Sequence, residues 1–329
     1  MLINKLFNNL IVLDLANNHF GDLLHSKKIV KSFAKVIKKH NINSTIKFQF
    51  RQLPEFIHKD SRKSDKKYIR RFLDTALSDL DFFKLFNYIK KNKILTSCTP
   101  FDEASVKKIE KFNFDFIKIA SVSALDFNLH ERVIKNRIPK IISTGGIKVE
   151  DIDKIVSFYL KEKQIFALMH CVSIYPSGND TLNLNFISNL KKRYENIPIG
   201  WSTHEDPKEF LPAALASANK ACIFEKHIGI NSKKYKLNNY SIKPDDFEAW
   251  YLNLKKAQSM LGSESKEKKV YPAEIKTILN LSRGVYAKND IKKNDTLNKK
   301  NTYFAMPLKK GELSSLNLKV GTQVKKKLR

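Results

Sequence analysis

Short apolar runs alternate with longer charged segments along most of this sequence, and no other feature limits the possible folds as strongly. The runs are rich in β-branched and aromatic residues, as expected for buried strands. We count eight runs: Leu10–Ala16, Thr45–Gln49, Ile94–Cys98, Phe114–Ala120, Lys140–Thr144, Ile165–Cys171, Ile197–Ser202 and Ala221–His227.

The segments between these runs carry apolar residues at helical spacing. Strict alternation of strands and helices predicts parallel strands joined by crossover helices. Eight such units in about 260 residues match the size of a (β/α)₈ barrel, so we predict a barrel over residues 1–262. The clearest helical segments are Lys27–Lys39, Lys67–Lys91, Glu103–Phe112, Val149–Leu160 and Pro207–Ala218.

The composition changes near residue 262. Residues 262–269 are Gly, Ser, Glu and Lys, a composition typical of a linker. Beyond residue 282, short strand-like runs and turns follow without a long helix. We therefore predict a linker over residues 263–282 and a small β-rich module over residues 283–329.

The net charge of +28 could indicate a nucleic-acid partner, since clustered basic residues neutralise phosphates. Only nine of the 61 basic residues are arginine, the residue that most often reads bases, and the lysines are spread over the whole length. We find no basic motif interleaved with aromatic residues. We therefore expect no nucleic-acid partner, although the positive field would speed encounter with anionic substrates.

The sequence also indicates the compartment. The apolar stretch Leu10–Ala16 is interrupted by Asp14 and is too short to cross a bilayer. The odd number of cysteines, each in a short apolar run, favours free thiols in a reducing compartment over disulfides. We expect a cytoplasmic protein without a membrane partner. The cysteines are Cys98, Cys171 and Cys222.

Polar residues gather at the carboxyl ends of the predicted strands, where barrel enzymes carry their active sites. A single histidine at a strand end is more often structural, but polar residues at all eight ends indicate a site. In strand order they are Asp14, Asn18 and His19; Lys47, Gln49 and Arg51; Thr99 and Asp102; Lys118 and Ser121; Ser143; His170, Ser173 and Tyr175; Ser202 and His204; Glu225 and His227.

Strand geometry suggests what these residues could bind. His204 and His227 end adjacent strands, so two imidazoles facing the barrel mouth could bind one divalent metal and leave positions open for substrate. Lys47 and Lys118 could hold a phosphate and a carboxylate together with nearby hydroxyl groups. These hydroxyls belong to Thr99, Ser121, Ser143 and Ser202.

Ordered motifs over residues 10–262 resemble those of the N-acetylneuraminate (sialic acid) synthase family. Residues 283–312 are similar to the antifreeze-like (SAF) domain that follows the barrel in that family. The resemblance implies a domain-swapped homodimer in which this domain reaches the partner's active site. The motifs are Asn18-His-Phe-Gly21, Lys47-Phe-Gln49, Thr99-Pro-Phe-Asp102, Lys118-Ile-Ala-Ser121, Ser143-Thr-Gly-Gly146, His170-Cys171, Tyr175-Pro176, Gly200-Trp-Ser-Thr-His204 and Glu225-Lys-His227.

The resemblance implies that the enzyme condenses phosphoenolpyruvate with an N-acylated hexosamine-type aldose, releases phosphate and forms a nonulosonic, sialic-acid-like acid. A divalent metal such as Mn²⁺, Mg²⁺ or Co²⁺ on His204 and His227 would polarise the aldehyde. Asp14 occupies the position of a glutamate that acts on the water or aldehyde at the metal. With Lys47 and Glu225, these residues form the implied catalytic set. The implied phosphoenolpyruvate contacts are Lys47, Gln49, Thr99, Lys118, Ser121, Ser143, Ser173 and Ser202, and the implied sugar contacts are Asn18, Ser123, Tyr175 and Met306.

Several positions depart from the family pattern. Asp14 is one methylene shorter than the usual glutamate, and Ser173 replaces an asparagine that holds the phosphate. Ser123 replaces a glutamate, and Met306 an arginine, that contact the sugar. The C-terminal domain is also shortened. An alternative is a non-catalytic or regulatory sugar- or phosphate-binding barrel derived from the family.

Overall fold

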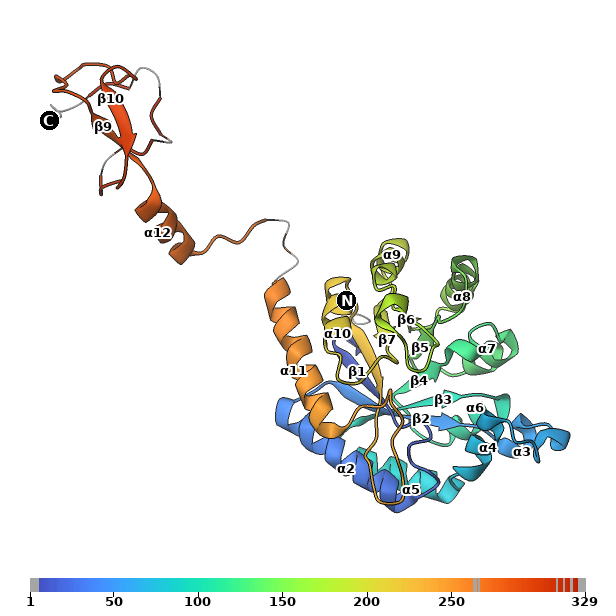
Figure 1. The fold of residues 1–329 in the computed structure, drawn as a ribbon. Helices are drawn as coiled ribbons and strands as arrows, with labels where there is room; N and C mark the ends of the chain where they lie inside the picture. The colour runs from blue at the N-terminus through green and yellow to red at the C-terminus, as the bar shows by residue number, and fades with distance from the viewer. Residues whose placement is uncertain are drawn as a thin grey trace. The chain divides into compact units, whose positions relative to one another are not determined.

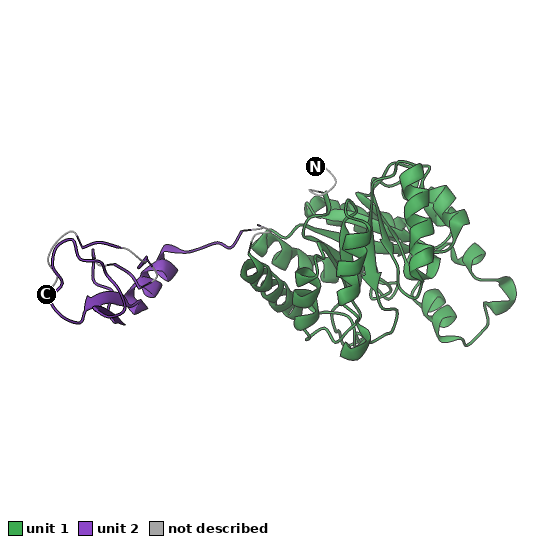
Figure 2. Ribbon diagram, turned by 90° about the horizontal axis from the view of Figure 1, so that it is seen from above, with its two compact units in different colours: residues 1–262 green, residues 263–329 purple. Residues whose placement is uncertain are grey.

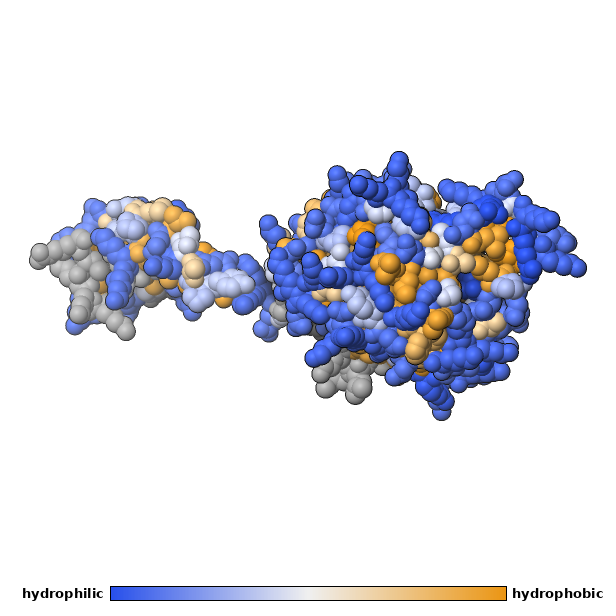
Figure 3. All heavy atoms as spheres, turned by 90° about the horizontal axis from the view of Figure 1, so that it is seen from below, coloured by the Kyte–Doolittle hydropathy of each residue, from blue (hydrophilic) through white to orange (hydrophobic). Residues whose placement is uncertain are grey.

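The computed structural model forms two compact units, Met1–Gly262 and Ser263–Arg329, which are described separately (Figure 2). Charged and polar side chains cover most of the face shown in Figure 3, with small hydrophobic patches between them. No helix among the described residues is both long and apolar enough to cross a membrane. The structure describes residues 6–262, 265, 267–311, 313–315, 317–319 and 322–324.

The first unit is a closed barrel of eight parallel strands (Figure 1). Each strand pairs with the next in sequence, and β8 pairs with β1. The predicted (β/α)₈ barrel is confirmed, and every strand overlaps one of the eight apolar runs. The strands are β1 (Leu10–Asp14), β2 (Ser44–Phe50), β3 (Leu95–Pro100), β4 (Phe116–Ile119), β5 (Lys140–Ser143), β6 (Phe166–Cys171), β7 (Ile199–Ser202) and β8 (Ile223–His227).

Helices surround the barrel (Figure 1). They bury apolar stripes against the outward-facing strand residues; α2, for example, buries Ile29, Val30, Phe33 and Ile37. The helices are α2 (Leu23–His40), α3 (Leu53–Phe56), α4 (Lys67–Asp74), α5 (Asp79–Lys91), α6 (Glu103–Glu110), α7 (Phe127–Val133), α8 (Val149–Lys161), α9 (Asn185–Arg193), α10 (Leu211–Ala218) and α11 (Pro244–Leu261).

The segment Lys67–Lys91 forms two helices, α4 and α5, although its spacing predicted one continuous helical segment. Ser78 starts the second helix, because its side chain accepts a hydrogen bond from the backbone amide of Asp81. Leu77 is buried beside this cap. The break leaves α4 as a separate element whose residues reach the barrel mouth.

Inward-facing strand residues form two layers of different chemistry. Near the amino ends they are mostly apolar. Toward the carboxyl ends the same faces become polar: Glu225 lies two positions after Ile223, and Asp14 and Lys118 occupy equivalent places in their strands. The barrel is therefore closed by a packed core beneath a polar mouth. The apolar layer comprises Leu10, Val12, Phe116, Ile141, Ala167, Met169 and Ile223, and Phe7, from the segment before β1, packs with it.

The second unit contains α12 (Pro272–Leu281), which lies within the predicted linker, and two antiparallel strands, β9 (Gly284–Ala287) and β10 (Thr302–Ala305). Ile291, Leu297 and Val324 form a small buried cluster. The assignment of this unit to the antifreeze-like (SAF) domains stays a prediction.

Candidate active site

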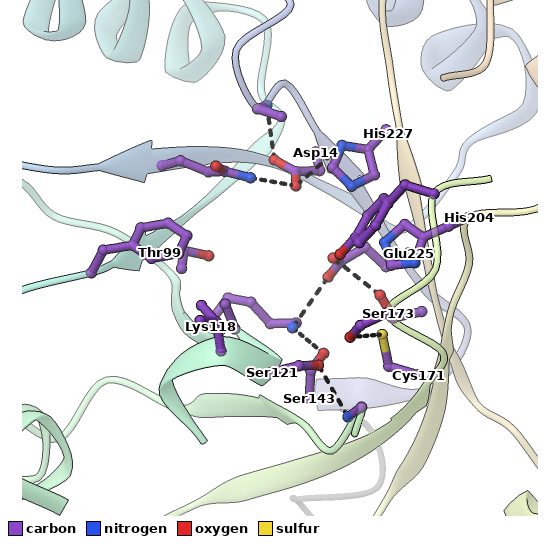
Figure 4. Close-up of a pocket in the computed structure, with 18 of the residues that line it drawn as sticks. Asp14, Thr99, Lys118, Ser121, Ser143, Cys171, Ser173, His204, Glu225 and His227 are labelled. Atoms are coloured by element: carbon purple, nitrogen blue, oxygen red, sulfur yellow. Dashed lines mark hydrogen bonds and ion pairs between the residues drawn. The ribbon is translucent and has the colours of Figure 1, made fainter. Parts of the chain in front are cut away.

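The carboxyl ends of the barrel strands surround a cavity of about 760 Å³ (Figure 4). Most of the residues predicted from the strand ends line this cavity, although they are spread over more than 200 positions of sequence. Those that line it are Asp14, Lys47, Gln49, Arg51, Thr99, Lys118, Ser121, Ser143, Ser173, Tyr175, Ser202, His204, Glu225 and His227.

Lys47 joins two carboxylates at the floor of the cavity. Its ammonium lies 2.9 Å from Glu225 Oε1 and 3.1 Å from Asp14 Oδ2, and all three side chains are buried. Burial opposes the charge on Lys47, but Asp14 and Glu225 outweigh this effect and raise the pKa of the lysine. Lys47 is therefore charged at neutral pH.

Glu225 also faces a second buried lysine. Lys118 Nζ lies 3.8 Å from Glu225 Oε2 and donates hydrogen bonds to the Ser143 hydroxyl and to the Ile119 carbonyl, 3.2 Å away. Burial alone would raise the pKa of Glu225, but Lys118 and Lys47 lower it to about 2. Burial lowers the pKa of Lys118, against the opposing charge of Glu225. Lys118 therefore has the less compensated charge and gains more from a bound anion.

Asp14 is held by three donors. Its Oδ1 accepts from the Ala16 amide at 2.9 Å, and its Oδ2 accepts from Gln49 Nε2 at 2.9 Å in addition to the contact with Lys47. Gln49 is oriented in turn by Arg51, whose Nη2 donates to Gln49 Oε1 at 3.0 Å. This chain of hydrogen bonds holds the Asp14 carboxylate in place at the cavity.

Two imidazoles meet at one side of the cavity, where the ring centroids of His204 and His227 lie 5.3 Å apart. His204 Nδ1 lies 2.9 Å from the Val172 carbonyl and so donates to it, which leaves Nε2 with a free lone pair. His227 Nδ1 is buried without a hydrogen-bond partner among the described residues and lies 3.6 Å from Asp14 Oδ2.

This donor set fits a divalent metal with open positions, because it offers two imidazole nitrogens at the ends of adjacent strands. Burial lowers the pKa of His227, with Asp14 opposing, and so favours the neutral ring that metals bind. No group of three or more potential metal ligands is assembled within the part of the chain that the structure describes. Two histidines alone would leave most of the coordination to substrate and water.

Hydroxyl groups line the opposite wall. Thr99 Oγ1 is buried without a partner among the described residues, so it is available to a ligand. Ser121 Oγ accepts from the Gly145 amide at 3.0 Å. A Cβ at Gly145 would lie 2.5 Å from Ser173 Oγ and 2.8 Å from Ser121 Oγ, so only glycine allows these two hydroxyls to approach the loop.

Two predicted sugar contacts of the barrel, Asn18 and Ser123, do not line the cavity. Asn18 is buried and donates to the Ile228 carbonyl and to Ser241, which ties two loops together. Ser123 is buried in the short 3₁₀ helix after β4, where the adjacent Val122 lines the cavity instead. Met306 belongs to the second unit and is 56% exposed.

Other cavity residues received no role from the sequence. Arg51, Lys67, Arg71 and Tyr240 line the cavity, from segments outside the barrel strands. The position of Arg51 at the end of a predicted strand was the only feature of the sequence that placed it near the site. Helical spacing in α4 marked an amphipathic helix but gave no sign that one edge of it faces the cavity, and Tyr240 lies in a long loop without a motif.

A closed parallel barrel with buried lysine–carboxylate pairs and two imidazoles at its carboxyl end defines an enzyme of the barrel class, with its active site at the mouth. The sequence profile of the NeuB family matches residues 35–266. The chain belongs to the NeuB family and is a sialic acid synthase-like enzyme.

Known proteins support this assignment. The chain is 27% identical to pseudaminic acid synthase of Campylobacter jejuni over 311 residues, which cover 90% of this chain and 87% of the relative. A solved structure from Chromobacterium violaceum, described as spore coat polysaccharide biosynthesis protein E, superposes with a TM-score of 0.89 at 34% identity and covers 96% of this chain and 98% of its own. The N-acetylneuraminic acid synthetase of Leptospira borgpetersenii, in complex with citrate, gives a TM-score of 0.70 at 27% identity and covers 82% and 89%.

Proposed function

We propose that this enzyme condenses phosphoenolpyruvate with an N-acylated hexosamine-type aldose, forms a nonulosonic acid and releases phosphate. The observation that carries the proposal is the pair of buried lysines, Lys47 and Lys118, around Glu225 in a cavity that also contains His204 and His227. Relatives named for making pseudaminic acid and N-acetylneuraminic acid support the same reaction class.

The floor of the cavity suits phosphoenolpyruvate. Lys47 and Lys118 supply two positive charges, and the buried hydroxyl-bearing residues Thr99 on β3 and Ser143 on β5 line the same cavity. Phosphate and carboxylate groups both accept such charge-assisted hydrogen bonds. Thr99 has no partner among the described residues, so binding would satisfy an orphaned hydroxyl.

The proposed reaction joins carbon 3 of phosphoenolpyruvate to the aldehyde carbon, adds water at carbon 2 and expels phosphate. Glu225 is ionised at neutral pH because Lys118 and Lys47 hold its pKa near 2, against the effect of burial. Its Oε2 atom has no hydrogen-bond partner among the described residues, so it can orient or accept a proton from the attacking water. Asp14 lies between Lys47 and His227 and can act on the aldehyde side.

His204 and His227 would hold a divalent cation such as Mn²⁺, Mg²⁺ or Co²⁺. When bound, this ion supplies Lewis-acid polarisation of the aldehyde oxygen. The hydrogen bond from His204 Nδ1 to the Val172 carbonyl sets the tautomer that binding requires.

The test is phosphate release from phosphoenolpyruvate with a panel of aldoses, with and without Mn²⁺. Release that depends on both the aldose and the metal supports the proposal. A protein that binds phosphoenolpyruvate but never releases phosphate, with any aldose or metal, would instead be the non-catalytic alternative. The domain-swapped homodimer also stays a proposal, which light scattering tests through the molar mass.

A further inference from the structure

A group of positive side chains lines the cavity beyond the strands. Arg51 follows β2, and Lys67 and Arg71 lie on α4. Of the described residues that line the cavity, only Asp14 and Glu225 carry carboxylates, and Lys47 already contacts both. These three cations therefore add charge that the cavity wall itself does not neutralise.

Arg51 is held rigidly in place. Its guanidinium carbon lies 3.6 Å from the ring centroid of Phe101 and 4.0 Å from that of Phe72, so the group is sandwiched between two rings. Nη2 donates to Gln49, whereas Nε is buried without a hydrogen-bond partner among the described residues. A buried donor without a partner is costly unless a ligand satisfies it.

Arg71 differs from its neighbour Arg70. Arg70 lies 2.8 Å from Asp74 and is partly exposed, as is usual for a surface ion pair on a helix. Arg71 instead lines the cavity and donates to the Tyr240 hydroxyl at 3.2 Å. The two arginines of one helical turn thus have opposite roles, and Arg71 keeps donors available toward the cavity.

The positive charges also act on one another. Burial and the charge of Arg71 lower the pKa of Arg51 to about 10, although Asp14 and Asp102 oppose this shift. Like charges held close together destabilise the empty site, and a bound anion reduces that repulsion.

We propose that Arg51, Arg71 and Lys67 bind an anionic substituent, phosphate or carboxylate, on the sugar aldehyde. This inference rests on the proposed function, and it names the class of sugar: a hexosamine charged at the end opposite its aldehyde. Phosphoenolpyruvate has its own cations at the floor, Lys47 and Lys118, so these three are left for the second substrate. Arg51 and Arg71 carry most of the interaction, since Lys67 is exposed to solvent.

The experiment compares three sugars that differ at one carbon: N-acetylmannosamine, its 6-phosphate and its 6-carboxylate. Wild-type enzyme should use a charged sugar at least roughly tenfold more efficiently than the neutral one, the effect of one charge-assisted pair. The charged sugar that the enzyme uses more efficiently shows whether the site binds a phosphate or a carboxylate. Arg71→Gln should remove this preference without changing the KM for phosphoenolpyruvate, and Arg70→Gln is the matched control that should keep it.

Two outcomes overturn the inference: equal use of charged and neutral sugars by the wild type, or a preference for charge that survives in Arg71→Gln. Thermal unfolding shows whether each variant is folded. Calorimetry with the sugar 6-phosphate and 6-carboxylate, without turnover, separates this inference from the proposed function. If no sugar supports phosphate release, the proposed function fails. Binding of a charged sugar that Arg71→Gln weakens would still support the anion site in that case. If neither charged sugar binds, the anion site is rejected.

Discussion

Lys226 Nζ lies 2.7 Å from Glu205 Oε1, and neither side chain is exposed to solvent. Lys226 stands between Glu225 and His227 on β8, and Glu205 follows His204 after β7. The ion pair therefore connects the two backbone segments that carry the imidazoles, from behind the cavity. Its geometry helps to determine where both rings lie.

Breaking this pair should be costly. Glu205→Gln leaves a buried ammonium without a countercharge, so we expect a loss of about 3–5 kcal/mol in the free energy of unfolding. The double variant Glu205→Met with Lys226→Met should lose much less, because it removes both charges. Urea denaturation measures all three proteins. Asp151→Asn, which breaks the solvent-exposed pair with Lys154, is the control that should change stability little.

A second prediction concerns Lys47. Lys47→Ala removes the cation between Asp14 and Glu225, so catalytic efficiency with phosphoenolpyruvate should fall roughly tenfold or more. Steady-state kinetics with phosphoenolpyruvate as the varied substrate measures this effect, with circular dichroism to check folding. Wild-type kinetics in a folded variant would show that Lys47 does not contact the substrate.

Removal of metal provides a third prediction. EDTA should abolish turnover, and Mn²⁺, Co²⁺ or Mg²⁺ should restore it. Loss of even an outer partner of a metal ligand weakens binding by roughly 10–100-fold, so His204→Gln and His227→Gln should each weaken Mn²⁺ binding at least tenfold in calorimetry. His170→Gln is a useful comparison, because His170 contacts the Leu182 carbonyl at 2.9 Å and does not line the cavity. Full turnover by metal-free protein would refute the metal assignment.

Stability should also depend on His19. Its Nδ1 accepts from the Gly21 amide at 3.1 Å, and burial, with the charge of Arg51, lowers its pKa to about 4. In the unfolded chain His19 binds a proton near pH 6.5, whereas in the folded chain it does so only near pH 4. The contribution of neutral His19 to the free energy of unfolding is therefore complete above pH 6.5. It is lost as the pH falls to 4, and the loss amounts to roughly 3 kcal/mol.

His19→Gln should flatten this part of the stability profile. Urea denaturation between pH 7 and pH 4 measures the slope for wild type and variant. His58→Gln removes a histidine whose side chain is 70% exposed and should leave the slope unchanged. An identical slope in His19→Gln would mean that other groups cause the acid sensitivity.

The sequence predicted all eight strands because a buried parallel strand has a local signature of consecutive β-branched residues. Helices α7, α9 and α11 were not among the clearest predicted segments. In α9 only Ile187 and Leu190 are buried, so its apolar stripe is short, and α11 follows a long loop. The break between α4 and α5 depended on one capping residue, Ser78.

The residues of the site also divide into those that the local sequence predicts and those that it does not. Residues on the strands, such as Lys47 and Glu225, could be assigned to a shared face, because strand register determines where they point. Arg71 and Tyr240 come from a helix and a loop, whose approach to the cavity depends on tertiary packing. Asn18 occupies a motif, yet its amide bonds to Ile228 and Ser241, which no local pattern could reveal.

The last prediction concerns Met306. The resemblance to the sialic acid synthase family implies that Met306 stands where that family has an arginine that contacts the acylamino group of the sugar. A thioether donates no hydrogen bond to an amide oxygen and prefers apolar contact. The enzyme should therefore discriminate poorly between an N-acetyl group and bulkier or less polar substituents, or should use a sugar other than N-acetylmannosamine. Catalytic efficiency across N-acetylmannosamine, N-acylated analogues and 2,4-diacetamido-trideoxyhexoses measures this preference.

Met306→Arg should raise selectivity for the N-acetyl group, because it restores a donor fork. The competing explanation is that Arg283 of the same unit contacts the acyl group instead; its guanidinium carbon now lies 5.8 Å from the ring centroid of Phe304. Arg283→Gln distinguishes the two residues. If Arg283→Gln lowers selectivity and Met306→Arg leaves it unchanged, then Arg283 reads the acyl group and Met306 does not determine the choice of sugar.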